Sequence, residues 1–224
     1  MSIPKAVIKG KIKLFAGFLT LFLGFAPIAG RSDGIAGQFD YYVMALSWSP
    51  NWCERTGIAR GSPQCAPERR LGWMLHGLWP QYETGWPSHC PTEFSDPTFD
   101  QSVAMADIMG TASLATYEWE KHGTCSGLEA DRYFGISRDA FEAVVLPPTF
   151  DRIKVVQEMS AKSVEDAFLK ANLSFKANML TVICTSGQIQ EVRICLTKDL
   201  TPRPCGRDVS RDCRLDDAVV HPVR

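Results

Sequence analysis

The sequence predicts an α+β domain, in which a central antiparallel β-sheet packs against helices and is stapled by disulfides. Two strand-like runs come first, at 39–48 and 71–79, helical patterning occupies the middle of the chain, and a hairpin pattern lies near the C-terminus. Strands and helices are therefore segregated along the chain. This order favours an α+β domain over a repeated βαβ unit.

The first thirty residues have the layout of a secretory signal peptide. Four lysines precede the apolar run Leu14–Phe25, and no acidic residue appears before Asp33. The run is shorter than the roughly 20 residues of a spanning helix, and small residues follow it where a peptidase could cut. We expect a signal peptide at 1–30, with an uncleaved anchor as the alternative, and one domain at 31–224.

Without that leader the chain is acidic and rich in cysteine. Removing four lysines leaves 24 − 4 = 20 cations against 25 anions. This balance argues against a stoichiometric nucleic-acid binder, but not against an enzyme that needs a few local cations. The even number of cysteines beside an export signal predicts four disulfides and an oxidising compartment. The eight are Cys53, Cys65, Cys90, Cys125, Cys184, Cys195, Cys205 and Cys213.

The strands follow from local composition. FDYYVMALSW at 39–48 is aromatic and aliphatic and is followed by Pro50, and LGWMLHGLW at 71–79 is expected to stop at Pro80. The cysteine-containing stretch 53–70 between them predicts a stapled loop. Farther on, two β-branched runs at 179–185 and 188–197 are separated by Ser186 and Gly187, which is a hairpin signal.

Three helices are expected between these strands. Their ranges are 102–123, 138–145 and 163–172. The third begins with Ser163, Val164, Glu165 and Asp166, a capping-box-like start in which the serine side chain accepts a first-turn amide. A long loop rich in proline, glycine and aromatic residues precedes the first helix, at 81–98.

The segment YEWEKHGTC, residues 117–125, is the most informative of the chain. On a helix, Glu118, Lys121 and His122 fall at i, i+3 and i+4, so that a carboxylate, an ammonium and an imidazole share one face. Gly123 then ends the helix. An exposed helix end with ordinary charge pairing is the alternative reading of this segment alone.

A second segment, HGLWP at 76–80, places His76 within or at the end of a strand, where a histidine alone is more often a satisfied core residue. Together the two segments supply two histidines, a carboxylate and a lysine. These suffice for phosphodiester transesterification by the 2′-OH of RNA, because one imidazole accepts a proton, the other donates one, and the lysine stabilises the developing charge. This chemistry needs no metal, and no CxxC pair or histidine cluster suggests one.

HGLWPQ at 76–81 and EWEKHGTC at 118–125 resemble the two signature blocks of the ribonuclease T2 family, and FDYYVMALSWSPNWC at 39–53 is similar to its first strand. The resemblance covers about residues 38–215. It implies that His122 is the general base and His76 the general acid. It also implies that Glu118 and Lys121 stabilise the pentacoordinate phosphorus species.

Four further residues are candidates for substrate binding. Tyr117 stands where many members of the family have a histidine that helps to hold the phosphate, and its hydroxyl can still donate to an oxygen. In similar proteins the tryptophan of HGLWP, here Trp79, and an aromatic near Trp86 form the main base site, and Gln81 follows in the same loop. For Trp79, core packing is the alternative. Four other tryptophans are assigned to the core: Trp48, Trp52, Trp73 and Trp119.

The resemblance also suggests how the cysteines pair. It implies Cys90–Cys125, which would tether the aromatic loop to the end of the catalytic helix. A plausible set is completed by Cys184–Cys213, Cys195–Cys205 and Cys53–Cys65. Sequence alone does not choose among the 105 possible pairings of eight cysteines.

The resemblance implies an endoribonuclease that cleaves single-stranded RNA with low base specificity, through a 2′,3′-cyclic phosphate to 3′-phosphate ends. No cofactor and no metal is expected, DNA should be inert, and the mature form should be a monomer without a membrane anchor, in the periplasm or outside the cell. One alternative is a secreted RNA-binding or interaction protein on the same fold without turnover. Another is a metal-dependent phosphodiesterase, which EDTA would inactivate.

Overall fold

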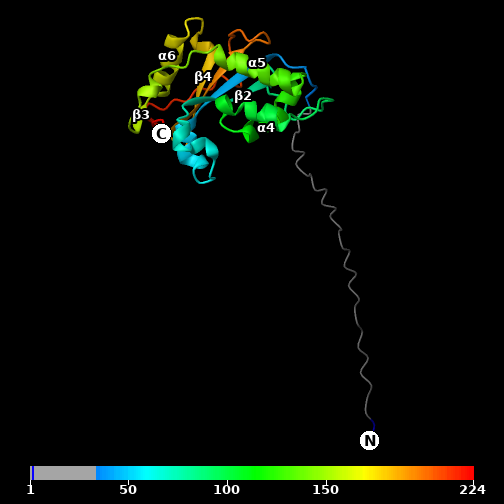
Figure 1. Cartoon of the computed structure of the whole chain (residues 1–224), viewed down its shortest axis with the longest axis horizontal. Helices are drawn as coiled ribbons and strands as arrows, with labels where there is room; N and C mark the ends of the chain where they lie inside the picture. The colour runs from blue at the N-terminus through cyan, green and yellow to red at the C-terminus, as the bar shows by residue number, and fades with distance from the viewer. Residues whose placement is uncertain (1, 3–33) are drawn as a thin grey trace. The chain divides into compact units, whose positions relative to one another are not determined.

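The computed structural model describes residue 2 and residues 34–224. Residues 34–224 belong to one compact unit, which is drawn in colour in Figure 1. Apart from Ser2, the expected signal peptide at 1–30 lies outside the described residues. None of the described helices combines the length and hydrophobicity that a membrane span requires.

The fold class is confirmed: a sheet lies at the centre of an α+β domain. Its order is β2-β1-β5-β6-β3, and β4 pairs with β5. The strand pairs are antiparallel, except that β5 and β6 meet in parallel at Gln188 and Val219. The strands are β1 (Tyr41–Trp48), β2 (Trp73–Gln81), β3 (Gln157–Met159), β4 (Leu180–Thr185), β5 (Gln188–Leu196) and β6 (Ala218–Val220).

The described helices lie mainly between β2 and β4 in the sequence. They are α1 (Ser49–Trp52), α2 (Phe99–Ala104), α3 (Ala106–Met109), α4 (Ala112–Lys121), α5 (Ala130–Glu142) and α6 (Ala161–Ala171). A π-helical turn at Cys53–Gly57 lies within the stretch that was expected to be a stapled loop. Short 3-10 turns occur at Pro63–Cys65, Pro67–Arg69, Gly123–Ser126, Phe150–Arg152 and Ala177–Met179.

The prediction of one helix over 102–123 is wrong, because the chain breaks it into α2, α3 and α4. Gly110 has φ 87°, a left-handed conformation that ends α3. Thr111 then restarts the chain as the cap of α4, since its side chain accepts from Leu114 N at 3.1 Å. Only α4 reaches the EWEKHGTC block, and it ends at Lys121, one residue before His122.

Other boundaries also differ from the sequence-based expectation. Helix α5 begins at Ala130 rather than at 138, because Tyr133 and Phe134 already bury one face of it. Strand β2 continues through Pro80 to Gln81, which is possible because β2 lies at the edge of the sheet. Ser160, not Ser163, caps α6. The strands β3 and β6 were not expected, since three residues are too few to show an alternating pattern.

The two faces of the sheet have different neighbours. On one face, alternate residues of β1 join the main core, which also contains apolar side chains of α4, α5 and α6. Trp48, Trp73 and Trp119 are buried there, as expected. Trp52 is a correction, because it is half-buried and lies outside that core. The opposite face carries a small cluster of Tyr41, Val43, Cys195 and Val209.

Four disulfides join the described cysteines in the pairs that the resemblance implied. They are Cys53–Cys65, Cys90–Cys125, Cys184–Cys213 and Cys195–Cys205. Beside the second of these, His89 N donates to Lys121 O at 2.8 Å. The aromatic loop is thereby fastened to the end of α4.

Candidate active site

His76 is the extra residue of a β-bulge in β2. Ala45 of β1 pairs with Gly77 and Leu46 pairs with Leu75, so that His76 has no partner in the register. A bulge redirects the side chains beside it, and bulges are common next to active sites. Leu75 and Leu78 remain in the main core, whereas the imidazole of His76 is partly exposed in the hollows beside the strand.

Gly77 allows α4 to approach this bulge closely. A Cβ atom on Gly77 would lie 2.1 Å from Glu118 Oε2 and 2.4 Å from Trp79 Nε1. Glu118 is almost fully buried, and its Oε1 lies 3.5 Å from His76 Nε2. The glycine of HGLWP is therefore needed so that a carboxylate of one block can reach the histidine of the other.

Trp79 lies between the two histidines. Its ring is edge-on to His76 and stacked with His122, with both centroid distances 5.2 Å. Its Nε1 donates to Glu118 Oε2 at 2.6 Å. The guanidinium of Arg193 lies 5.2 Å from the centroid of the same ring. Contacts with several residues of the site thus fix the indole.

The end of α4 positions His122. The helix ends at Lys121, and His122 caps it with its N–H donated to Glu118 O at 2.9 Å. Gly123 follows where a Cβ would meet Trp119 at 2.5 Å. The imidazole of His122 is buried, and its Nδ1 has no hydrogen-bond partner among the described residues.

The two histidines have opposite pKa shifts. Burial, together with the charges of Lys121 and His76, lowers the pKa of His122 to about 3. Burial also disfavours the charged form of His76, but the hydrogen bond and charge of Glu191, with the charge of Glu118, outweigh it and raise the pKa of His76. Separated pKa values in one site are the pattern of a general base beside a general acid.

The two carboxylates in contact with His76 also differ. Burial raises the pKa of Glu118, although His76, the indole of Trp79 and Lys121 oppose it. Burial disfavours the charged form of Glu191 too, but its bond to His76 and the nearby Arg193 outweigh burial and lower its pKa. Glu191 is accordingly ionised at neutral pH.

Sequence reasoning missed Glu191 and Arg193, which lie on β5. Glu191 Oε1 is 2.6 Å from His76 Nδ1, and Arg193 Nε and Nη2 each donate to Glu191 Oε2 at 3.1 Å. One signal could have found them: two charged residues at i and i+2 share a face of the strand QIQEVRICL.

The four predicted catalytic residues line one hollow of about 340 Å³. Three of the predicted substrate residues, Trp79, Gln81 and Trp86, also line it. Gln81 Nε2 donates to Gly85 O at 3.0 Å, and Trp86 is 53% exposed. The remaining lining residues are Val43, Glu191, Arg193, Asp208 and Val209.

Tyr117, the fourth predicted substrate residue, does not line this hollow. It is 47% exposed on α4, and Lys121 Nζ lies 5.5 Å from the centroid of its ring. The structure therefore does not bring Tyr117 together with the other predicted substrate residues.

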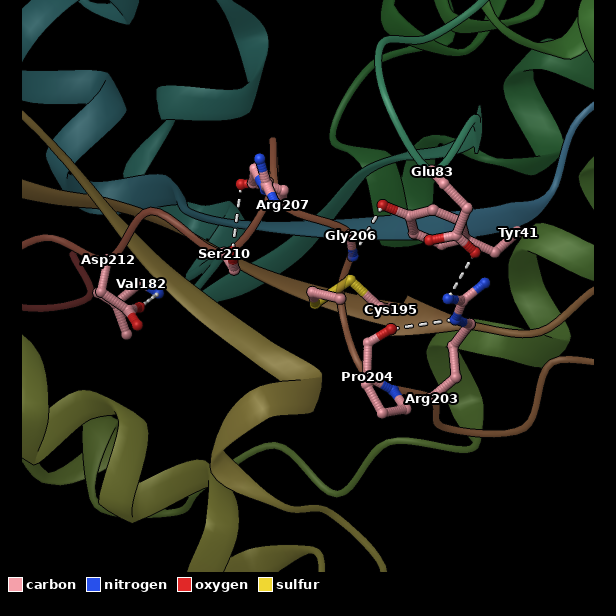
Figure 2. The surroundings of a disulfide bond; sticks show 11 residues. Tyr41, Glu83, Val182, Cys195, Arg203, Pro204, Gly206, Arg207, Ser210 and Asp212 are labelled. Carbon is pink, nitrogen blue, oxygen red and sulfur yellow. Dashed lines mark hydrogen bonds and ion pairs between the residues drawn. A yellow bond between two sulfur atoms is a disulfide. The ribbon is translucent and has the colours of Figure 1, made fainter.

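The C-terminal segment contributes Asp208 and Val209 to the lining of the hollow. The Cys195–Cys205 disulfide fixes this segment to β5, and Gly206 N donates to the hydroxyl of Tyr41 at 3.2 Å (Figure 2). Arg203 pairs with Glu83 at 2.7 Å, as Figure 2 shows. Asp208 accepts from Gly85 N, one residue before Trp86. The segment therefore braces the loop that carries the exposed tryptophan.

A second hollow, of about 420 Å³, also has His76 in its lining. Its lining includes Ser47 of β1, Trp52, Gln64, Ser113 and Gln190. His76 belongs to both hollows, so the histidine stands where the two meet. Sequence reasoning did not predict this second hollow, because its lining residues come from widely separated parts of the chain.

Comparison with known proteins places these observations in context. The chain matches the model of the Ribonuclease T2 family over residues 39–205. A ribonuclease of Aeromonas hydrophila is 47% identical over 111 residues, which are 50% of this chain and 49% of that protein. Ribonuclease T2 of Sus scrofa is 26% identical over 67% of this chain and 84% of its own length. The chain spans about half the length of the relatives that it matches at 31–47% identity.

Among solved structures, the S-like ribonuclease trichomaglin is similar with a TM-score of 0.64 at 21% identity. The likeness covers 84% of this chain and all of that one. At this level of identity the similarity concerns the fold.

Proposed function

Because the chain belongs to the ribonuclease T2 family, we propose that it is an endoribonuclease that cleaves single-stranded RNA by transesterification. The observation that carries the proposal is that His76 and His122 line one hollow together with Glu118 and Lys121. The opposite pKa shifts of the two histidines agree with it. The open side of the hollow carries Trp86.

In the first step His122, neutral because its pKa is lowered to about 3, removes the proton from the 2′-OH. The 2′ oxygen attacks phosphorus, and the bond from phosphorus to the 5′ oxygen breaks. His76 gives its Nε2 proton to that leaving oxygen, while its Nδ1 stays bound to Glu191. The products are a 2′,3′-cyclic phosphate and a free 5′-OH. Water then opens the ring to a 3′-phosphate with the proton transfers reversed.

Lys121 and Glu118 act on the charge that develops at phosphorus. The ammonium of Lys121 lines the hollow and would stabilise the phosphorane oxygens more than the ground state. Glu118 accepts from Trp79 and lies 3.5 Å from His76, so it fixes both neighbours in place. The family resemblance implies stabilisation of the pentacoordinate phosphorus species by both residues; the contacts of Glu118 support a positioning role beside it.

The RNA strand would cross His76 from one hollow to the other. Since the scissile phosphate must reach this histidine, the nucleotides on its two sides would occupy the two hollows that share it. Stacking on Trp86 suits any base, because every base has an aromatic face. Low base specificity follows for that side of the cleavage site.

Neither alternative gains support from the site. A binding protein without turnover should lack a member of the catalytic set, and all four residues meet at one hollow. A metal-dependent phosphodiesterase needs clustered ligands, and within the described part of the chain no three His, Cys, Asp or Glu side chains gather to form such a site.

We place the protein in an exported compartment, the periplasm or the extracellular space, as a monomer with residues 1–30 removed. Four disulfides support an oxidising compartment. The N-terminal sequence of the protein recovered from periplasm or medium tests the cleavage. Light scattering tests the monomer.

The proposed function is tested by digesting uniform RNA and uniform DNA in the presence of EDTA. We expect wild type to cut RNA to cyclic-phosphate products and to leave DNA intact, and both His76→Ala and His122→Ala to be inactive. No RNA cleavage by folded wild type would contradict the proposal. Loss of activity with EDTA alone would favour the metal-dependent alternative.

A further inference from the structure

The mechanism above leaves one buried charge of the site without a chemical role. Glu191 is 3% exposed in the middle of β5, where an isolated carboxylate would be costly. It belongs to neither catalytic block, and it lies 115 residues from His76 in sequence. The pairing of the strands brings it to His76.

The register of the central strand brings Glu191 and His76 together. Strand β1 lies between β2 and β5, and its Ser47 pairs with Glu191 while its Ala45 pairs with Gly77. Ala45 and Ser47 alternate with the core residues Met44 and Leu46 and so face the site. Because both side chains are small, those of β2 and β5 can meet across β1.

The resulting contacts form a chain of three residues. His76 Nδ1 and Glu191 Oε1 are 2.6 Å apart, a short distance typical of a charge-assisted bond. The other oxygen, Oε2, accepts from Nε and Nη2 of Arg193, which holds the carboxylate in a fixed plane. Because Nδ1 is bound to Glu191, Nε2, which lies 3.5 Å from Glu118 Oε1, is the nitrogen left to give a proton to the substrate.

We propose that Glu191 is a positioning residue that orients His76 and keeps its imidazole charged for donation to the leaving oxygen, with Arg193 fixing Glu191 in turn. This inference rests on the proposed ribonuclease function. It explains the role of His76 as the acid by a contact with a residue that lies outside both sequence blocks. It also makes β5, which carries Glu191 and Arg193, part of the active site.

Several charged groups surround His76 and determine in which direction each substitution shifts its pKa. Glu118, Lys121 and His122 face it from α4 and its end, Glu191 and Arg193 from β5, and Arg55 of the π-helical turn interacts with Glu191. Glu191 and Glu118 raise the pKa of His76, whereas Arg193 lowers it. Removing Glu191 and removing Arg193 should therefore shift that pKa in opposite directions.

The test is the pH dependence of kcat/KM, which reports the free enzyme. In Glu191→Gln the amide can still accept a hydrogen bond but carries no charge, so we expect the alkaline limb to move to lower pH by about 1–3 units. In Arg193→Met we expect the limb to stay or to move to higher pH. Glu191→Asp keeps the negative charge on a shorter side chain. Compared with Glu191→Gln, it should return the alkaline limb toward its wild-type pH more fully than it returns the rate toward the wild-type value.

Two measurements separate positioning from folding. Glu165→Gln removes another buried carboxylate, on α6 and away from both hollows, and should leave the limb unchanged. The pKa of His76, followed directly by NMR, should fall in Glu191→Gln even where its turnover is too slow to measure.

An unchanged His76 pKa and an unchanged alkaline limb in folded Glu191→Gln would overturn the role of Glu191, while the ribonuclease proposal would stand. The same result from a variant that only melts at lower temperature would assign Glu191 a structural role. Absence of RNA cleavage by wild type would overturn both proposals.

Discussion

The indole nitrogen of Trp79 donates to Glu118 Oε2 at 2.6 Å, which joins the strand block to the helix block through one hydrogen bond. The same ring stacks with His122 and meets His76 edge-on. Sequence reasoning assigned Trp79 either to base binding or to the core. These contacts favour a third role, in which the tryptophan holds Glu118 and separates the two histidines.

Trp79→Phe tests that role. Phenylalanine keeps the aromatic contacts but loses the N–H that donates to Glu118. We therefore expect kcat to fall by about 10–100-fold, which corresponds to the loss of one hydrogen bond to a charged group. KM should change little. Steady-state kinetics on a dinucleotide substrate checks the split, and a rise in KM alone would instead support base binding.

Trp119→Phe is the matched control. Trp119 is fully buried, and its indole nitrogen has no partner among the described residues. Its replacement should leave kcat near the value of wild type.

Gly77→Ala should damage both stability and turnover. The added Cβ would lie 2.1 Å from Glu118 Oε2, so α4 or β2 must shift. We expect the free energy of unfolding in urea to fall by about 1–3 kcal/mol, as for other overpacked sites. Displacing the carboxylate by about 1 Å should lower kcat/KM by about 100-fold.

Gly135→Ala provides the comparison, since nothing lies within 4 Å of its added Cβ on α5. That variant should be as stable as wild type or more so, because alanine favours a helix over glycine. Equal stability of the two variants would contradict the close approach of α4 to β2.

The pH profile of kcat/KM should be broad. The base must be neutral, and because burial and neighbouring charge lower the pKa of His122 to about 3, the acid limb should appear only near that pH. The acid must be protonated, and since the pKa of His76 is raised above its usual 6.5, activity should persist at neutral pH and fall above it. Circular dichroism at each pH separates titration from unfolding. An acid limb near 6.5 would be evidence against His122 as the base.

Trp86→Ala should weaken binding of RNA without affecting its chemistry. The ring is 53% exposed at the hollow, and stacking on such a ring is worth about 1–3 kcal/mol per base. We expect the free energy of substrate binding to become less favourable by that amount, so that KM rises while kcat stays unchanged. Phe99→Ala removes an aromatic that is 76% exposed outside both hollows, and should leave KM unchanged.

The catalytic residues that lie close together in the sequence could be predicted from it. His76 and Gly77 lie in one short block and Glu118, Lys121 and His122 in another, so local spacing sufficed for them. The α+β class also followed from local pattern, because strands and helices occupy separate stretches.

The contacts that could not be predicted from the sequence depend on the pairing register of the strands. Glu191 reaches His76 only because Ala45 and Ser47 of the strand between them are small, and no local pattern reveals which residues face each other across three strands. The break at Gly110 was equally hidden, since glycine inside a helical pattern marks an end only when its φ becomes positive.

The central claim is that the 2′-OH of RNA is the nucleophile, that His122 removes its proton, and that His76 protonates the leaving 5′ oxygen. Its most direct test is a DNA oligonucleotide that contains a single ribonucleotide, digested in EDTA and analysed by mass spectrometry at early times. We expect one cut, on the 3′ side of the ribonucleotide, with a 2′,3′-cyclic phosphate on one product and a 5′-OH on the other. Cleavage at deoxyribonucleotide linkages, or a 5′-phosphate product, would contradict the claim.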